Sequence, residues 1–360
     1  MAKTTSTTPS AAALILAGGS GTRLWPRSTD ERPKPFLELG GGKSLLAETF
    51  DRAAAVAGPD GVFFSARVSH EELIRREFPA LPAGRLVLEP ERRNTAPAIA
   101  LSALVVDEVR PGATLVVLPS DQGVRDPEAF GAALALAVEA ARQGDVFVTL
   151  GVPPTRPETA YGYLETGVDD AGSPVRRVLR FVEKPPLETA ERYFRSGNFY
   201  WNAGIFAFRI PVLLAAMEEL CPEILAAARD AHAARKAGNA VGFAAAFARS
   251  PKLSIDYAVM EKARDVRTVP ADCGWSDLGS WDAVHEFRTK DAAGNAAEGS
   301  ATLIGSSNSL VLASERPVVL IGLDGVIVVD SPAGLLVSRK GASDDLRTFV
   351  EQEIAKGRRA

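Results

Sequence analysis

The chain has 360 residues, of which 46% are hydrophobic and 24% are charged, a balance typical of a soluble globular protein with a sizeable core. A formal net charge of −4 gives no basic excess for a nucleic-acid backbone or an anionic membrane, and no apolar run reaches the roughly 20 residues of a membrane helix. Cys221 and Cys273 match neither a disulfide framework nor a metal motif, so we expect two reduced thiols in a cytoplasmic protein.

The N-terminal part predicts an α/β domain after a disordered tail over 1–11. Short β-rich runs alternate with segments that carry apolar residues at helical spacing, which indicates βαβ units and a mixed, mostly parallel sheet. This is a Rossmann-like three-layer architecture, in which ligands bind at the carboxyl ends of the strands. The expected strands are 13–17, 61–66, 85–89, 114–121 and 145–151, and the expected helices are 45–57, 70–78, 96–109 and 127–142.

The middle of the chain, 151–284, extends the same sheet. It mixes strand-like runs at 175–185 and 203–209 with helical segments at 188–196 and 211–235. We therefore expect one catalytic domain over 12–290, which is near the size at which single cores stop growing.

The C-terminal part predicts a separate small β domain over 296–360, closed by a helix at 344–356. An Asp/Ala/Gly/Asn stretch at 291–299 is typical of a linker. Five short β-rich runs follow between Gly, Ser, Asn and Pro residues, and their spacing favours coil-like stacking, without a fixed-period repeat. We expect a small β domain similar to a left-handed β-helix. The runs are 301–305, 309–313, 318–322, 325–330 and 334–338.

The strongest local motif is LILAGGSGTRLWPRSTDERPKPFLEL, 14–39, a strand followed by a glycine-rich turn and a polar loop. It is neither a Walker A loop, which would need Gly-Lys-Ser/Thr, nor GxGxxG, because Leu24 takes the place of the third glycine. Glycines allow backbone N–H groups to approach an anion, and four cations share the loop, which suits a triphosphate. An ordinary solvated βα loop is the alternative. The cations are Arg23, Arg27, Arg32 and Lys34, and Pro26, Pro33 and Pro35 oppose a long helix here.

Two aspartates are candidate Mg²⁺ ligands. Asp121 ends the run TLVVLPSD at the carboxyl end of a strand, where a carboxylate can act as a hard oxygen ligand. Alone it is more often a turn or cap residue. Asp277, in CGWSDLGSWD, would complete a two-carboxylate site if the fold brings it near Asp121.

Two further motifs, RFVEKP and YWNAGIFAF, offer groups that could bind a phosphorylated sugar. Glu183 could accept hydrogen bonds from hydroxyls, and Lys184 could hold a phosphate. Asn202 offers a further donor and acceptor for hydroxyls, with Gly204 leaving the backbone open. A plain strand end and a turn are the alternative interpretation.

With these motifs laid out, the chain resembles the sugar nucleotidyltransferases, and within them the bacterial mannose-1-phosphate guanylyltransferases. The resemblance runs from about Leu14 to Asp330. It also includes EPERRNTAPAIAL at 89–101, TLGVPPTRPETAYGYLETG at 149–167 and SIDYAVMEKA at 254–263. Gln122 and Ala160 depart from the residues common in relatives, as does the lack of an acidic residue near 332–333.

The resemblance implies a role for each motif. Arg23, Lys34 and Lys184 would be the catalytic cations, and Asp121 and Asp277 would bind Mg²⁺. The sugar phosphate would contact Tyr161, Gly162, Glu183, Lys184 and Asn202. The nucleotide would contact Ala17, Gly18, Gly19, Gly21, Thr22, Glu89, Asn94, Thr95 and Ser120.

The reaction implied is transfer of GMP from GTP to mannose 1-phosphate with Mg²⁺, by a homodimer that needs no nucleic acid or membrane partner. Three alternatives remain: another sugar phosphate or nucleotide, a NAD(P)-dependent Rossmann enzyme, and a regulatory nucleotide-sugar-binding subunit. The second would need a third glycine at Leu24 and an acidic residue where Ser65 and Arg67 lie. Isomerase activity, found in longer relatives with a further domain, is not expected.

Overall fold

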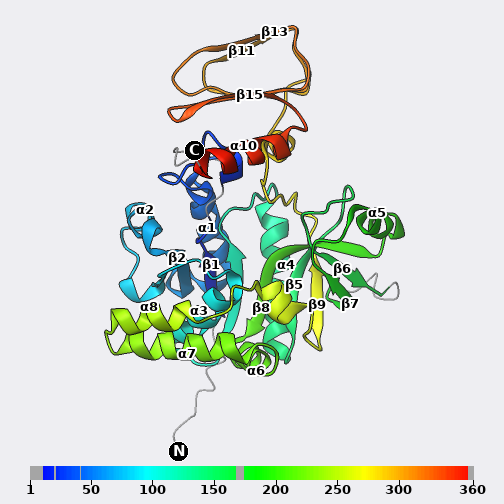
Figure 1. Cartoon of the computed structure of the whole chain (residues 1–360). Helices are drawn as coiled ribbons and strands as arrows, with labels where there is room; N and C mark the ends of the chain where they lie inside the picture. The colour runs from blue at the N-terminus through cyan, green and yellow to red at the C-terminus, as the bar shows by residue number, and fades with distance from the viewer. Residues whose placement is uncertain (1–10, 20–21, 41, 168–173, 356–360) are drawn as a thin grey trace, which may run out of the picture. The chain divides into compact units, whose positions relative to one another are not determined.

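The protein is described here by a computed structural model, which covers residues 11–19, 22–40, 42–167 and 174–355 (Figure 1). The predicted tail, 1–11, lies outside the described residues apart from Ala11. The chain forms two compact units. The first unit comprises the chain up to Gly18 with Thr49–Ser120 and Asp126–Cys273, and the second unit comprises Gly19–Glu48, Asp121–Arg125 and the chain from Gly274.

The first unit is built on a nine-stranded sheet of order β3-β2-β1-β4-β8-β5-β9-β7-β6. The pairings place seven strands in one direction and β7 and β8 in the other, which confirms the predicted mixed, mostly parallel sheet. The strands are β1 Ala11–Leu16, β2 Val62–Arg67, β3 Leu86–Glu89, β4 Thr114–Pro119, β5 Phe147–Val152, β6 Tyr163–Thr166, β7 Arg176–Val182, β8 Phe199–Arg209 and β9 Val266–Pro270.

Helices cover the sheet on both faces. Helix α3 packs on β1, β2 and β3, and it shares one apolar cluster with α6 and α7, whereas α4 packs on β4, β5, β8 and β9 and adds no side chain to that cluster. The three-layer α/β fold is therefore confirmed (Figure 1). The helices are α1 Leu45–Ala57, α2 Glu71–Glu77, α3 Thr95–Val109, α4 Pro127–Gln143, α5 Leu187–Ser196, α6 Ile210–Leu220, α7 Pro222–Lys236 and α8 Ala240–Ala248.

Two expected elements differ in the structure. The helical segment 211–235 is two helices, because Pro222 has no N–H to continue α6 and keeps Cys221 out of the helical region, at φ −152°. The expected linker 291–299 contains a strand, β10 Ala296–Glu298, since Ala296 is buried and the strand pairs with β12. Cys221 and Cys273 are free thiols, as expected.

The second unit contains the C-terminal β strands. A four-stranded sheet of order β10-β12-β14-β15 is parallel except for β15, and β11 pairs with β13 in parallel. The expected strands and closing helix are present; the left-handed form of the coil stays a prediction. The elements are β11 Ala301–Ile304, β12 Leu310–Leu312, β13 Val318–Ile321, β14 Val326–Ser331, β15 Gly334–Arg339, α9 Trp281–Phe287 and α10 Ser343–Ala355.

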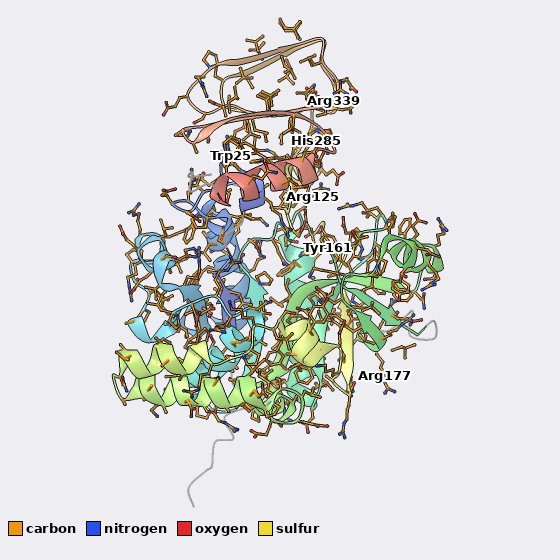
Figure 2. The ribbon with its side chains drawn as sticks, in the orientation of Figure 1. Trp25, Arg125, Tyr161, Arg177, His285 and Arg339 are labelled. Carbon is orange, nitrogen blue, oxygen red and sulfur yellow. The ribbon has the colours of Figure 1, made fainter. Side chains whose placement is uncertain are left out.

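The N-terminal loop belongs to the second unit through its apolar side chains. Leu24, Leu37 and Leu39 share a core with Trp281 and the β-domain strands. The ring of Trp25, labelled in Figure 2, lies 5.6 Å from the ring of Phe349, a residue of α10. The predicted domain limits, 12–290 and 296–360, do not follow this packing and stay a prediction. In the described part of the chain no helix has the length and apolarity to cross a membrane.

Candidate functional site

In the second unit, Lys34 joins the two candidate metal ligands. Lys34 opens a 3-10 turn, Lys34–Phe36, with Pro35 directly after it, and it is only 5% exposed. Its Nζ donates to Asp121 Oδ2 at 3.0 Å and to the carbonyl of Asp277 at 2.5 Å. A buried ammonium needs such acceptors, so Lys34 ties together chain segments 87 and 243 residues away in sequence.

Backbone pairing brings the two aspartates to the same place. Gly123 and Ser276 form an isolated antiparallel bridge with two hydrogen bonds of 2.9 Å. Trp275 Nε1 donates to Gln122 Oε1 at 2.9 Å beside this bridge. Gln122, a departure from the relatives, thus helps to hold the segments that carry Asp121 and Asp277.

The turn after Asp277 is strained in a way that fixes its carboxylate. Leu278 has φ +46°, which is rare for a bulky residue. Gly279 N donates to Asp277 Oδ1 at 3.1 Å, and a Cβ at Gly279 would lie 2.5 Å from Asp277 Oδ2. Only glycine leaves this space, so the backbone is shaped around the carboxylate. Such strain persists where the surrounding structure enforces it, often at functional sites.

The donor set suits a hard divalent cation completed by substrate oxygens. The described residues contain no group of three or more His, Cys, Asp or Glu side chains that could hold a metal by themselves. Mg²⁺ commonly binds through one or two carboxylates together with substrate phosphates and water. Lys34 contacts a carboxylate oxygen of Asp121 and the backbone carbonyl of Asp277, so two residues of the right chemical type lie at this lysine, and their binding of Mg²⁺ stays a prediction.

Part of the glycine-rich turn lies in the first unit, at the end of β1. Ala17 N donates to Ser65 O at 2.7 Å, and its carbonyl contacts His70 Nδ1 at 2.8 Å. Ser120 bonds to Leu16 O through both N and Oγ. The predicted residues Ala17 and Ser120 therefore lie at adjacent strand ends, and His70, for which no role was predicted, orients the turn.

The remaining turn residues are described only in part. Gly19 is exposed, with nothing near its Cβ position, and Arg23 is exposed in the 3-10 turn Thr22–Leu24. Gly21 and the side chain of Thr22 lie outside the described part of the chain. Their predicted contacts with the nucleotide remain predictions.

Glu89 is buried beside the turn. Its Oε1 accepts a hydrogen bond from Ser65 Oγ at 2.9 Å, and a Cβ on Gly18 would lie 3.3 Å from that oxygen. Burial raises the pKa of Glu89, although the Ser65 hydrogen bond and the charges of Arg67 and Arg92 lower it. A carboxylate at a strand end can accept hydrogen bonds from a ligand, which favour its ionised form.

Asn94 caps helix α3, and Thr95 is the first residue of that helix. Asn94 has φ +70° and its Oδ1 accepts from Thr95 N at 2.8 Å, while Thr95 Oγ1 accepts from Ile255 N at 2.9 Å. The structure gives both residues a local role. Their contact with a base stays a prediction.

The five residues predicted to bind the sugar phosphate meet in the first unit. Lys184 N donates to Tyr161 O at 3.2 Å, and Asn202 N donates to Gly162 O at 2.8 Å. A Cβ at Gly162 would lie 2.5 Å from Glu183 Oε2 and 3.3 Å from Asn202 Cβ. The carboxylate of Glu183, the amide of Asn202 and the ammonium of Lys184 therefore lie around Gly162, which has no side chain.

Lys184 has a strained backbone and a close carboxylate partner. Its φ is +48°, and its Nζ pairs with Glu183 Oε1. Burial lowers the pKa of Lys184, but the hydrogen bond and charge of Glu183 outweigh it and raise the pKa above its ordinary value. Lys184 is therefore a permanent cation, with its side chain about half exposed to receive an anion.

Asp256 belongs to this group, although no role was predicted for it. It opens a π-helical turn, Asp256–Met260, a rare form that is frequent at functional sites. Its Oδ1 accepts from Asn202 Nδ2 at 3.0 Å, while Asn202 Oδ1 accepts from Thr149 Oγ1 and Gly204 N. The amide of Asn202 is thus fixed in one orientation. The sequence signal that could have identified Asp256 is an acidic residue among apolar neighbours in SIDYAVMEKA.

Replacing Asp256 with asparagine should change how stability depends on pH. Burial, with the charge of Glu183, raises the pKa of Asp256 to about 6 from 3.8. A raised folded-state pKa means that the wild type loses stability as pH rises from about 4 to about 6. Because Asp256 keeps some exposed surface, the variant should gain about 1–2 kcal/mol over the wild type in that window. Urea unfolding at pH steps from 4 to 8 measures this; a difference that is flat with pH contradicts it.

Replacing Gly162 with alanine should displace the Glu183 carboxylate, since that side chain is only 7% exposed and has little room to move. We expect the KM for the sugar phosphate to rise roughly tenfold to a hundredfold, because small misplacements in a site are costly. The KM for the nucleotide should stay near the wild-type value. Gly84→Ala, with nothing near its Cβ position, is the matched control; equal kinetics for the two variants would contradict the assignment.

Two protein-family models match the chain. The model for nucleotidyl transferase matches residues 12–294. The model for the mannose-phosphate isomerase/GMP-like β-helix domain matches residues 299–352. Together they cover both the α/β part and the C-terminal β strands.

Individual proteins resemble the chain over most of its length. Xanthan biosynthesis protein XanB of Xanthomonas campestris pv. campestris is 41% identical over 355 residues, covering 96% of this chain and 73% of that protein. A mannose-1-phosphate guanylyltransferase of Klebsiella pneumoniae is 38% identical, covering 94% and 73%. A crystal structure from Thermus thermophilus, titled mannose-1-phosphate geranyltransferase, superposes with TM-score 0.86 at 35% identity, covering 95% and 98%.

Proposed function

Because the chain belongs to the nucleotidyl transferase family, we propose that it transfers GMP from GTP to α-D-mannose 1-phosphate, releasing pyrophosphate and GDP-mannose. The relatives named mannose-1-phosphate guanylyltransferase support the choice of substrates. The observation that carries the proposal is the group formed by Lys34, Asp121 and Asp277, a cation between two candidate metal ligands.

The proposed nucleotidyl transfer requires stabilisation of charge rather than proton transfer. An oxygen of the sugar phosphate, already anionic near pH 7, attacks the α-phosphorus of GTP, and the bond to pyrophosphate breaks in line. No general base is needed. Lys34 and Arg23 offset the charge that grows on the pyrophosphate, and Lys184 holds the sugar phosphate. Mg²⁺, which Asp121 and Asp277 would hold, supplies further charge neutralisation of the phosphate oxygens.

The residues of the first unit that are predicted to bind the sugar phosphate orient the sugar. Asn202, whose amide oxygen already accepts from Thr149 and Gly204, keeps one N–H to donate to a hydroxyl. Glu183 accepts from hydroxyls on the open side of Gly162. Positioning of this kind converts a two-substrate encounter into an effectively unimolecular step.

Glu89 is proposed to recognise the guanine base of GTP. Guanine presents two neighbouring N–H donors on one edge, and a carboxylate can accept both. Burial raises the pKa of Glu89, and hydrogen bonds from a bound base would favour its ionised form. This contact would favour GTP over UTP and dTTP, whose pyrimidine bases offer one N–H on the corresponding edge.

A substrate panel tests the proposal. Pyrophosphate release is measured with Mg²⁺ for GTP, ATP, UTP and dTTP, each paired with mannose, glucose and fucose 1-phosphates. The highest kcat/KM should belong to GTP with mannose 1-phosphate. A higher value for another pair would reassign the substrates, and no release from any pair would overturn the enzymatic role.

A further inference from the structure

The second unit contains a pocket apart from Lys34, Asp121 and Asp277, and two cations of the predicted triphosphate loop, Arg27 and Arg32, line it. It has a volume of about 560 Å³, within the range of about 300–1,000 Å³ typical of small-molecule sites. The N-terminal loop forms one wall and the β-domain strand ends form another. Its lining includes Arg27, Thr29, Arg288, Glu298, Ser314 and Ala333.

Two arginines on one wall of the pocket, called the inner wall below, form ion pairs with a single carboxylate. Arg27 Nη1 lies 2.7 Å from Glu298 Oε1, and Arg288 Nη2 lies 2.6 Å from Glu298 Oε2. Each arginine side chain is only 16% exposed. Burial raises the pKa of Glu298, but the hydrogen bonds and charges of both arginines outweigh it and hold the pKa below the ordinary value. Glu298 is therefore ionised, and the wall keeps one uncompensated positive charge.

The other charged residues of the lining, Arg32, Glu38 and Asp330, each have a partner of opposite charge, and the partner of Asp330 is Arg316, which does not line the pocket. Asp330 pairs with Arg316, and Arg32 lies 3.8 Å from Glu38 with both side chains more than half exposed. One nitrogen of the inner wall, Arg288 Nη1, is buried and has no hydrogen-bond partner among the described residues. A buried guanidinium N–H without an acceptor is unfavourable, so the guanidinium of Arg288 has donor capacity that Glu298 does not satisfy.

We propose that this pocket binds a small metabolite that carries a phosphate or carboxylate group, with the oxyanion on Arg27 and Arg288. Guanidinium groups match either oxyanion through paired N–H donors. The hydroxyls of Thr29 and Ser314 add polar partners, and the volume admits a molecule larger than the bare ion. This site is separate from the Lys34 group, although Leu37 and Glu38 of its lining directly follow the turn that contains Lys34.

Calorimetric titration of the full chain tests the proposal, with glycerol 2-phosphate and malonate as probes and no nucleotide or metal present. At least one probe should bind the wild type, and the probe that binds identifies the preferred oxyanion. Arg288→Gln should weaken binding at least tenfold. Arg339→Gln, an exposed arginine on β15 outside the pocket, should bind as the wild type does (Figure 2). Binding by neither probe, or equal binding by all three proteins, overturns the proposal.

A second variant distinguishes a loss of the binding site from a folding defect of Arg288→Gln. Ala333→Trp adds bulk at the exposed rim and removes no charge. It should abolish probe binding while leaving pyrophosphate release with GTP and mannose 1-phosphate near the wild-type rate. Unchanged probe binding in Ala333→Trp would place the anion elsewhere and overturn the proposal. Since binding is measured without turnover, this outcome is independent of whether the substrate assignment holds.

Discussion

Asp121→Asn is expected to lower kcat for pyrophosphate release by a factor of about 10²–10³, as does the loss of one preorganised charge contact in other enzymes. The asparagine oxygen can still accept the hydrogen bond from Lys34 Nζ, so the fold should be retained. What is lost is one negative charge on a hard oxygen ligand. Steady-state kinetics at saturating GTP and sugar phosphate, over a range of Mg²⁺ concentrations, measures the effect.

The matched control for this prediction is Asp60→Asn, which also removes one carboxylate charge. Asp60 pairs with Arg85 at the surface and lies outside the candidate site. Its kcat should stay within about twofold of the wild type, because exposed ion pairs contribute little. If Asp121→Asn turned over as fast as this control, Asp121 would not be a metal ligand.

Lys34→Met is expected to lower kcat by a similar factor of about 10²–10³, because the charge proposed to stabilise the leaving pyrophosphate is removed. The variant should also be less stable. The Asp277 carbonyl loses its donor, at a cost of about 1–3 kcal/mol. The lost pairing with Asp121 adds little, since that side chain is 37% exposed and screened by solvent.

Separating the two effects of Lys34→Met needs both kinetics and unfolding. Lys43→Met, an exposed lysine of the same loop, should leave kcat and the urea midpoint nearly unchanged. Activity is measured well below the midpoint of the variant, so that a folded population is compared. A variant that is destabilised but fully active would limit Lys34 to a structural role.

The strand and helix pattern was predictable because it depends on local periodicity. The runs around Ile15, Phe64 and Val117 are continuous apolar segments, as expected for strands covered on both faces, and all three are buried. The break at Pro222 and the strand at Ala296 were not predicted. In the first case the Ala-rich periodicity concealed a proline boundary, and in the second a three-residue strand depends on its partner β12.

The candidate site residues could be named from motifs, but their arrangement could not. Motif reasoning found Lys34, Asp121 and Asp277, but their meeting depends on a backbone bridge between residues 153 apart, 123 and 276, which no local pattern encodes. Asp256 was missed for a related reason. Its importance comes from its hydrogen bond to Asn202 and from its burial beside Glu183, both of which are properties of the fold.

The division into compact units also exceeded what the sequence could indicate. The loop that carries Lys34 follows the first strand directly, so linear reasoning assigns it to the α/β domain. Its leucines instead share a core with Trp281 and with the C-terminal strands. Such long-range packing leaves no periodic signal in a proline-rich loop.

The central claim is that Asp121 and Asp277 hold one divalent cation together with the polyphosphate. Its most direct test is the binding of Mn²⁺ in the presence of GTP, followed by electron paramagnetic resonance and without any turnover. The wild type should bind one Mn²⁺ per chain when GTP is present, and Asp121→Asn and Asp277→Asn should each bind it at least tenfold more weakly. Equal Mn²⁺ affinity in the wild type and both variants would contradict the account.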